Sequence, residues 1–165
     1  MNKNIIGIIV VVLVLVGIIW IARPNSQTNS AASLIQNSDG TLTAEEISFD
    51  FGSISMAAGE VRHSFPIKNT GAEPIAINKM YTSCMCTTAT LISGSKKIGP
   101  YGMPGHAFVP KINEVINSGD EAIVEVVFDP AAHGPAGVGR IQRIVTIENN
   151  AGQPLNLEFS ALVTP

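Results

Sequence analysis

The chain has 165 residues, and its 10 Lys and Arg against 13 Asp and Glu give a formal net charge of −3. That length is enough for one domain with an anchor and too short for two ordinary domains. The mildly acidic balance provides no basic surface for nucleic acid or for anionic lipid headgroups, so we expect no nucleic-acid partner.

Residues 5–22 form an uncharged, strongly apolar run near the start of the chain. A helix of this length, at about 1.5 Å per residue, crosses most of a hydrocarbon core about 30 Å thick, and Trp20 falls where an interfacial aromatic belongs. A cleaved signal peptide is the alternative, but its apolar run is shorter and ends in small residues, whereas Arg23 follows here. We therefore expect residues 1–23 to be an uncleaved transmembrane signal anchor.

We infer the orientation of this anchor from the charge of the segment that follows it. Lys3 and Arg23 flank the run, so the positive-charge bias across it is weak. The rest of the chain has 8 Lys and Arg against 13 Asp and Glu, and a net-acidic segment translocates readily. We expect a single-pass protein of the cell membrane, with its N-terminus inside and its domain on the periplasmic or cell-surface side.

Residues 24–43 are polar, small and without periodicity, which is typical of a flexible linker. From residue 44 to residue 165, short runs instead alternate apolar and polar side chains with the period of two that indicates half-buried strands. Strands are predicted at residues 47–51, 61–67, 74–81, 121–128, 140–147 and 155–163. No run has a helical period, so the predicted domain is all-β, an Ig-like antiparallel β-sandwich preceded by one N-terminal transmembrane helix.

Two irregular stretches interrupt the predicted strands. Residues 93–119 contain five Gly or Pro between positions 99 and 105, and residues 130–139 are also rich in Gly and Pro. Long loops inside a compact domain are usually functional or disordered, so these two stretches are where we look for function.

Several local motifs together resemble a known family. They are His63–Gly71 with its H-x-F and N-T-G elements, Thr82–Thr87 with its C-x-C element, Gly119-Asp120 and Phe128-Asp129. Over about residues 45–163 the chain resembles the DUF1573 family of exported bacterial Ig-like domains, which is related to sandwich modules of cilium and centrosome proteins. The resemblance implies the fold and brings no biochemical activity with it. Met85 stands where the family pattern has a glycine.

The C-x-C element is the strongest candidate for chemistry. On an extended strand the side chains of Cys84 and Cys86 point to the same face, so both sulfurs can approach one metal ion. Thiolate and thioether ligands select Cu(I), and thiolate with imidazole also suits zinc. A bond between residues i and i+2 closes a small ring, so the pair is predicted to be free thiols, a metal pair or a labile disulfide, not a structural staple.

The two irregular stretches supply further candidate ligands. Met103 and His106 lie in the first, and we expect its glycine-rich loop to fold back over the cysteines; His133 lies in the second. His63 is in phase with the apolar residues of its own strand, which favours a core histidine. Buried cysteines also pack as small apolar side chains, and loop histidines are commonly solvated. The predicted copper site comprises Cys84, Cys86, Met103, His106 and His133.

The function expected from the sequence is a membrane-anchored extracytoplasmic binding or interaction domain that binds Cu(I) and is not an enzyme. One alternative is a thiol redox protein using Cys84 and Cys86, which requires an exposed thiol beside a positive charge. The other is a structural or adhesion module without metal, which offers strand edges or loops to an envelope protein partner. The sequence has no motif for nucleophilic Ser, phosphate binding or zinc-protease chemistry.

Overall fold

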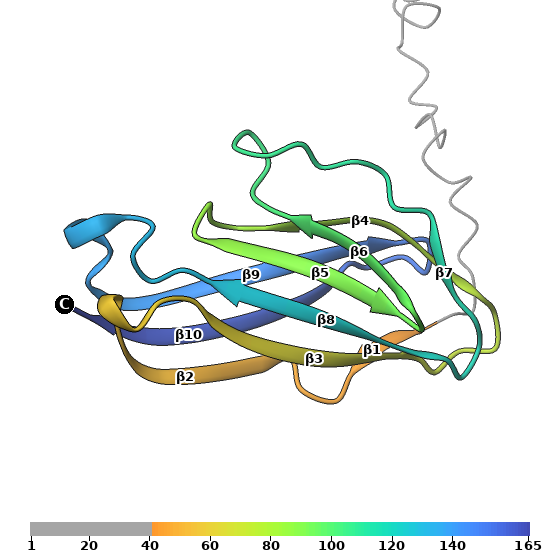
Figure 1. The fold of residues 1–165 in the computed structure, drawn as a ribbon. Coiled ribbons are helices and arrows are strands. Elements are labelled where there is room, and N and C mark those ends of the chain that lie inside the picture. The colour runs from red at the N-terminus through yellow and green to blue at the C-terminus, as the bar shows by residue number, and fades with distance from the viewer. Residues whose placement is uncertain (1–40) are drawn as a thin grey trace, which may run out of the picture. The chain divides into compact units, whose positions relative to one another are not determined.

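The computed structural model of the protein describes residues 41–165, which fold mainly into β-strands (Figure 1). The strands are β1 (Leu42–Ala44), β2 (Ser48–Ser55), β3 (Val61–Asn69), β4 (Ile75–Thr82), β5 (Thr87–Ser93), β6 (Lys96–Tyr101), β7 (Glu114–Ile116), β8 (Glu121–Phe128), β9 (Gly139–Asn149) and β10 (Leu155–Thr164). Two short 3-10 turns are η1 (Met56–Ala58) and η2 (Gly134–Gly137). The predicted transmembrane helix lies outside the described residues. Within residues 41–165, no helix is long and apolar enough to cross a membrane.

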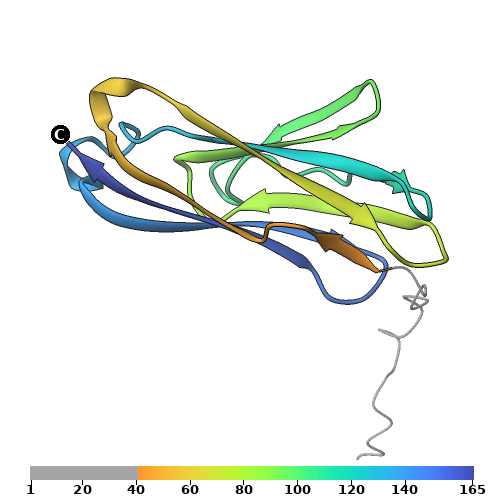
Figure 2. The same cartoon turned by 90° about the horizontal axis from the view of Figure 1, so that it is seen from below.

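The strands form two sheets that pack face to face (Figures 1 and 2). Sheet A has the strand order β1-β3-β8-β5-β6, and sheet B has the order β2-β10-β9-β4-β7. Neighbouring strands are antiparallel except for β2 and β10, which are parallel. The predicted all-β sandwich is confirmed, and the prediction of a purely antiparallel arrangement is wrong at this pair. Because β2 and β10 are far apart in sequence, no tight hairpin dictates their relative direction.

The core lies between the two sheets and is filled by alternate residues of their strands. In β8 and β10 the buried residues are Ala122, Val124, Val126, Phe128, Leu157, Phe159, Ala161 and Val163. This confirms the period of two that the sequence predicts for these strands. Burial of a large apolar side chain stabilises the fold by about 1.5–3 kcal/mol, so this core fixes where the connecting turns emerge.

The stretch 93–119 is more regular than predicted. β5 and β6 form a hairpin around Gly94 and Ser95, and Gly94 has a φ of 58°, which glycine adopts without strain. β7 then pairs with β4 at the edge of sheet B. The sequence does not predict β6, because this edge strand is mostly exposed and lacks apolar alternation. At the start of the described residues, β1 begins at Leu42, inside the range predicted to be linker.

Candidate functional site

Cys84–Cys86 lies in the turn that carries the chain from β4 in sheet B to β5 in sheet A (Figure 1). The backbone N–H of Thr87 donates to the carbonyl of Cys84 at 3.2 Å and closes the turn. The buried hydroxyl of Thr82 donates to the same carbonyl at 2.9 Å. The prediction that both cysteines lie on an extended strand is therefore wrong, because β4 ends at Thr82 and β5 begins at Thr87. The turn nevertheless brings the two sulfurs together.

Three hydrogen bonds hold this turn against both sheets. The N–H of Ser83 donates to the carbonyl of Ile144 in β9, and the N–H of Ile144 donates to Ser83 Oγ, both at 2.9 Å. The N–H of Asp129, just after β8, donates to the carbonyl of Cys86 at 2.9 Å. The position of the cysteines is thus fixed by the sandwich itself.

Cys84 and Cys86 are joined in a disulfide, with their Cα atoms 5.3 Å apart. Of the three states that the sequence leaves open, the structure contains the disulfide. Cys84 is 8% exposed and Cys86 is 3% exposed, whereas Met85 between them is 50% exposed. The disulfide therefore borders the apolar core and lies beneath an exposed turn.

Each sulfur has one cationic or potentially cationic neighbour. His133 Nε2 lies 3.1 Å from Cys84 Sγ. Arg143 Nε donates to Cys86 Sγ at 3.4 Å. The N–H of Cys86 also donates to Cys84 Sγ at 3.3 Å. Such contacts favour a negatively charged sulfur, so the surroundings suit a thiolate pair as well as a disulfide.

The structure brings three of the predicted ligands together. The ligand atoms of Cys84, Cys86 and His133 all lie within 4.8 Å of one another. His106 is exposed and does not belong to this group. Met103 is partly buried in the loop after β6, and its carbonyl accepts from the N–H of His106 at 3.1 Å. His133, from the second irregular stretch, is therefore the loop residue that reaches the cysteines.

The loop that carries Met103 starts close to the cysteine turn. Thr82 N–H, two residues before Cys84, donates to the carbonyl of Gly102 at 3.2 Å. Gly102 is buried, and a Cβ there would lie 3.3 Å from that of Ala107, so the loop is folded closely on itself. This contact places the loop's first residue beside the turn.

Arg143 is the site residue that the sequence did not predict. It lies in β9 and reaches a cysteine 57 positions earlier in the chain. Its position among alternating residues of a strand gives no local signal of a sulfur contact, because strand pairing alone sets that contact. The sequence offers only one weak signal, an arginine inside a strand that is predicted to be half-buried.

His63 has a structural environment, as its position in the strand predicts. Its ring stacks on Phe49 with centroids 3.6 Å apart. Its Nε2 lies 2.8 Å from Glu46 Oε2. The contacts of His63 are thus with an aromatic ring and a carboxylate, and it is not in the cysteine group.

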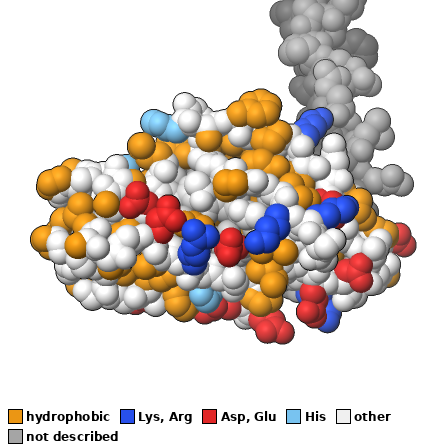
Figure 3. All heavy atoms as spheres, in the orientation of Figure 1, with side chains coloured by type: hydrophobic (Ala, Val, Ile, Leu, Met, Phe, Trp, Pro, Cys, Tyr) orange, Lys and Arg blue, Asp and Glu red, His pale blue; other side chains and the backbone are white. Residues whose placement is uncertain are grey.

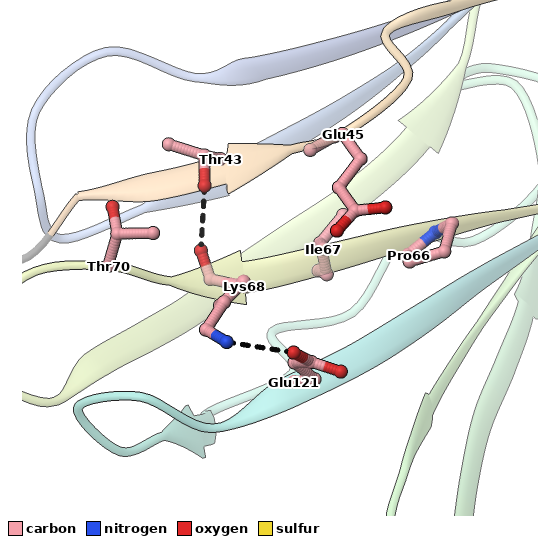
Figure 4. A pocket seen from close by; sticks show the side chains of 8 residues that line it. Thr43, Glu45, Pro66, Ile67, Lys68, Thr70 and Glu121 are labelled. Carbon is pink, nitrogen blue, oxygen red and sulfur yellow. Dashed lines mark hydrogen bonds and ion pairs between the residues drawn. The ribbon is translucent and has the colours of Figure 1, made fainter.

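Away from the cysteines, a hollow with a volume of about 390 Å³ is lined by residues of β1, β3 and the start of β8 (Figure 4). Its charged side chains include Lys68 and Glu121, which form an ion pair at 2.9 Å. The hydrogen bond with Glu121 raises the pKa of Lys68 above its ordinary value. Glu45 points into the same space (Figure 4). Because its lysine is already paired, this hollow offers weaker chemistry than the cysteine site.

The comparisons with known proteins agree with this architecture. Residues 42–102, which include the whole cysteine turn, match the model of a family described as "Protein of unknown function (DUF1573)". The fold itself is a β-sandwich of two five-stranded sheets. This match over residues 42–102 confirms the resemblance inferred from the motifs of the sequence. No curated protein matches the sequence.

Among solved structures, the fold resembles a protein of unknown function from Porphyromonas gingivalis W83. That match has a TM-score of 0.56 and 16% identity, and it covers 76% of this chain and 48% of the other. The chain thus spans about half the length of that protein, and the likeness shows the fold alone.

Two weaker matches are a PapD-like domain of human CEP192 and the secreted serine protease VesC from Vibrio cholerae. The CEP192 domain has a TM-score of 0.43, 12% identity and coverage of 74% of this chain and 84% of that one. VesC has a TM-score of 0.45, 12% identity and coverage of 79% and 24%.

Proposed function

We propose that this protein is a membrane-anchored extracytoplasmic binding domain whose reduced Cys84/Cys86 pair binds one Cu(I) with His133 as the third ligand. The observation that carries the proposal is the grouping of two sulfurs and one imidazole nitrogen within 4.8 Å of one another. Thiolate and imidazole ligands bind a metal at about 2.0–2.3 Å, so three such donors around one ion lie about 4 Å apart. The group reaches that geometry once reduction breaks the disulfide and lets the two sulfurs separate.

The donor set favours Cu(I) over zinc. Two soft thiolates with one imidazole match the ligand preference of Cu(I), whereas structural zinc has four closed ligands. Within the described residues, this group has three Cys or His donors, one fewer than a structural zinc site needs. Met103 and His106, from the loop that starts beside Thr82, stay predictions as supplementary ligands. Binding requires the reduced pair, because the thiolate is the form of cysteine that ligates metal.

Copper titration of the reduced protein tests this function. Full-length chain, reduced with a phosphine without oxygen, is expected to bind one Cu(I) in competition with a Cu(I) chelator. Cys84→Ser together with Cys86→Ser is expected to abolish that binding. Copper binding that survives the double change would rule out the proposed site.

The two loop histidines provide a matched pair of variants. His133→Ala is expected to weaken Cu(I) binding by at least about tenfold, because it removes a ligand within reach of both sulfurs. His106→Ala removes an exposed histidine of the other loop and is expected to have a smaller effect. If His106→Ala weakens binding more than His133→Ala does, the ligand set must be reassigned to the first loop.

The proposed anchor has a separate test. Because residues 5–22 are uncharged and apolar, the full chain is expected to sediment with membranes and to stay there at high salt. Deletion of residues 1–23 is expected to release the domain. A deletion variant that still sediments with membranes would contradict the anchor.

A further inference from the structure

A cavity with a volume of about 360 Å³ adjoins the disulfide and is lined by three basic residues. They are His133 from the β8–β9 connection, and Arg140 and Arg143 from β9. No Asp or Glu is among its lining residues. Figure 3 shows a different pattern on one face of the domain, where Lys and Arg lie among Asp and Glu. The cavity is thus a local concentration of positive charge on a net-acidic domain.

Among the described residues, the arginines of this cavity have no carboxylate within ion-pair distance, although Arg140 also lines a neighbouring hollow with Asp50 and its charge acts on that carboxylate. Within residues 41–165, neither Arg140 nor Arg143 forms an ion pair with a carboxylate, whereas Arg62, Lys68 and Lys96 do. Arg143 uses Nη1 to donate to the backbone carbonyl of Gln142 at 2.8 Å and Nε to reach a sulfur. A carboxylate that enters the cavity can therefore form charge-assisted hydrogen bonds without displacing an acidic side chain.

The same cavity wall contacts both sulfurs of the disulfide. His133 Nε2 is 3.1 Å from Cys84 Sγ, and Arg143 Nε is 3.4 Å from Cys86 Sγ. Cys84 is the more exposed of the two cysteines, and the residue that covers it, His133, is itself exposed. Because His133 is exposed, its side chain has room to rotate away from Cys84 Sγ.

We propose that this cavity binds a small thiol that carries a carboxylate, and that the Cys84–Cys86 disulfide oxidises it by thiol–disulfide exchange. The inference is independent of copper binding, because it uses the oxidised pair and two arginines that are not metal ligands. The carboxylate binds to Arg140 and Arg143, which places the thiol beside Cys84.

The exchange proceeds in two displacements. The thiolate of the bound molecule attacks Cys84 Sγ, the disulfide bond breaks, and its electron pair stays on Cys86 Sγ, where Arg143 stabilises the new charge. A second molecule of thiolate attacks the small-molecule sulfur of the mixed disulfide and releases the Cys84 thiolate. Two small thiols lose two electrons and two protons to become one disulfide, and the cysteine pair gains them to become two thiols.

Three thiols of similar size and different charge test the proposal. They are 3-mercaptopropionate, which is anionic, 2-mercaptoethanol, which is neutral, and cysteamine, which is cationic. Rate constants for reduction of the oxidised full-length chain are measured without metal, by trapping the released cysteines with an alkylating reagent and counting labels by mass. The thiols differ in intrinsic reactivity, so the informative quantity is the ratio of variant to wild-type rate for each thiol.

Arg140→Gln is expected to slow 3-mercaptopropionate by about tenfold, the size of one lost charge-assisted hydrogen bond, and to leave 2-mercaptoethanol unchanged. Arg140→Lys, which keeps the charge, is expected to restore most of the rate. Arg143→Gln is expected to slow all three thiols, because each of them needs the charge on Cys86 to be stabilised. Lys97→Gln, which removes an exposed charge from the edge strand β6, is the matched control and is expected to change none.

An equal effect of Arg140→Gln on all three thiols would overturn the carboxylate site. An unchanged rate with 2-mercaptoethanol in Arg143→Gln would overturn the assignment of Cys86 as the leaving group. Arg140→Gln is also expected to keep one Cu(I) per reduced chain, so failure of this proposal is distinguishable from failure of the copper site.

Discussion

Two sets of turns at opposite ends of the strands use polar groups in different ways. At one end, the buried side chains of Asn69 and Asn149 bind backbone groups close by. Asn69 donates to the carbonyls of Glu73 and Ile116 and accepts from the N–H of Gly71, at 2.8–3.0 Å. At the other end, the disulfide is contacted by an exposed histidine and by an arginine that lines a cavity.

This difference separates polar groups that support the fold from groups that are available for chemistry. The asparagines satisfy backbone donors and acceptors that burial would otherwise leave unpaired, and they direct no group toward solvent. The side chains that contact the sulfurs line a cavity instead, although Arg143 also donates to the backbone carbonyl of Gln142. Changes at the asparagine end are therefore expected to affect stability, and changes at the cysteine end are expected to affect binding.

The largest effect on stability is expected from Asn69→Ala. The change leaves the carbonyl of Ile116 and the N–H of Gly71 without their partner in a buried turn, so the free energy of unfolding is expected to fall by about 3 kcal/mol. Urea denaturation measures this free energy of unfolding. Thr70→Ala is the control, because the exposed hydroxyl of Thr70 makes a single hydrogen bond, at 3.2 Å. A loss no larger than that of the control would remove the distinction between the two ends.

The sequence predicts the fold well where every second side chain of a strand is buried, because apolar residues then recur with a period of two. β8 and β10 alternate because one face of each contacts the opposite sheet, and that pattern is local. It fails at β6, where an exposed edge strand has no apolar face to display. The sequence also does not predict that β2 and β10 are parallel, because their direction depends on which distant strands pair.

The candidate site is predictable for its cysteines and only in part for its neighbours. Cys84 and Cys86 are only two positions apart in sequence, so any short turn or strand brings them together. Whether His133 or His106 reaches the cysteines depends on the paths of two glycine-rich loops, and residue spacing does not predict those paths. The contact of Arg143 with Cys86 depends on the register of β9 in its sheet, and no sequence motif indicates it.

A smaller loss of stability is expected when the disulfide is reduced. The chain-entropy cost of a cross-link rises with the length of the closed loop, and Cys84 and Cys86 close a loop of sequence separation two. Reduction is therefore expected to lower the free energy of unfolding by at most about 1.5 kcal/mol. Urea midpoints with and without a phosphine reductant measure this. A loss as large as that of Asn69→Ala would identify the disulfide as a structural staple, contrary to the proposed role.

The smallest effect on stability is expected from His133→Ala, and His63→Ala provides the comparison within the same residue type. His133 is exposed, and its ring contacts Cys84 Sγ, so its removal is expected to change the free energy of unfolding by less than about 0.5 kcal/mol. His63 is partly buried, stacks on Phe49 and contacts Glu46, so its removal is expected to cost about 1–2 kcal/mol.

For binding of Cu(I) to the reduced chain the order reverses, because His133 belongs to the sulfur group and His63 does not. Thermal unfolding and chelator competition on both variants measure the two orders together. If His133→Ala destabilises the domain as much as His63→Ala does, its contact with Cys84 supports the turn. The cysteine end would then resemble the asparagine end in being built for stability.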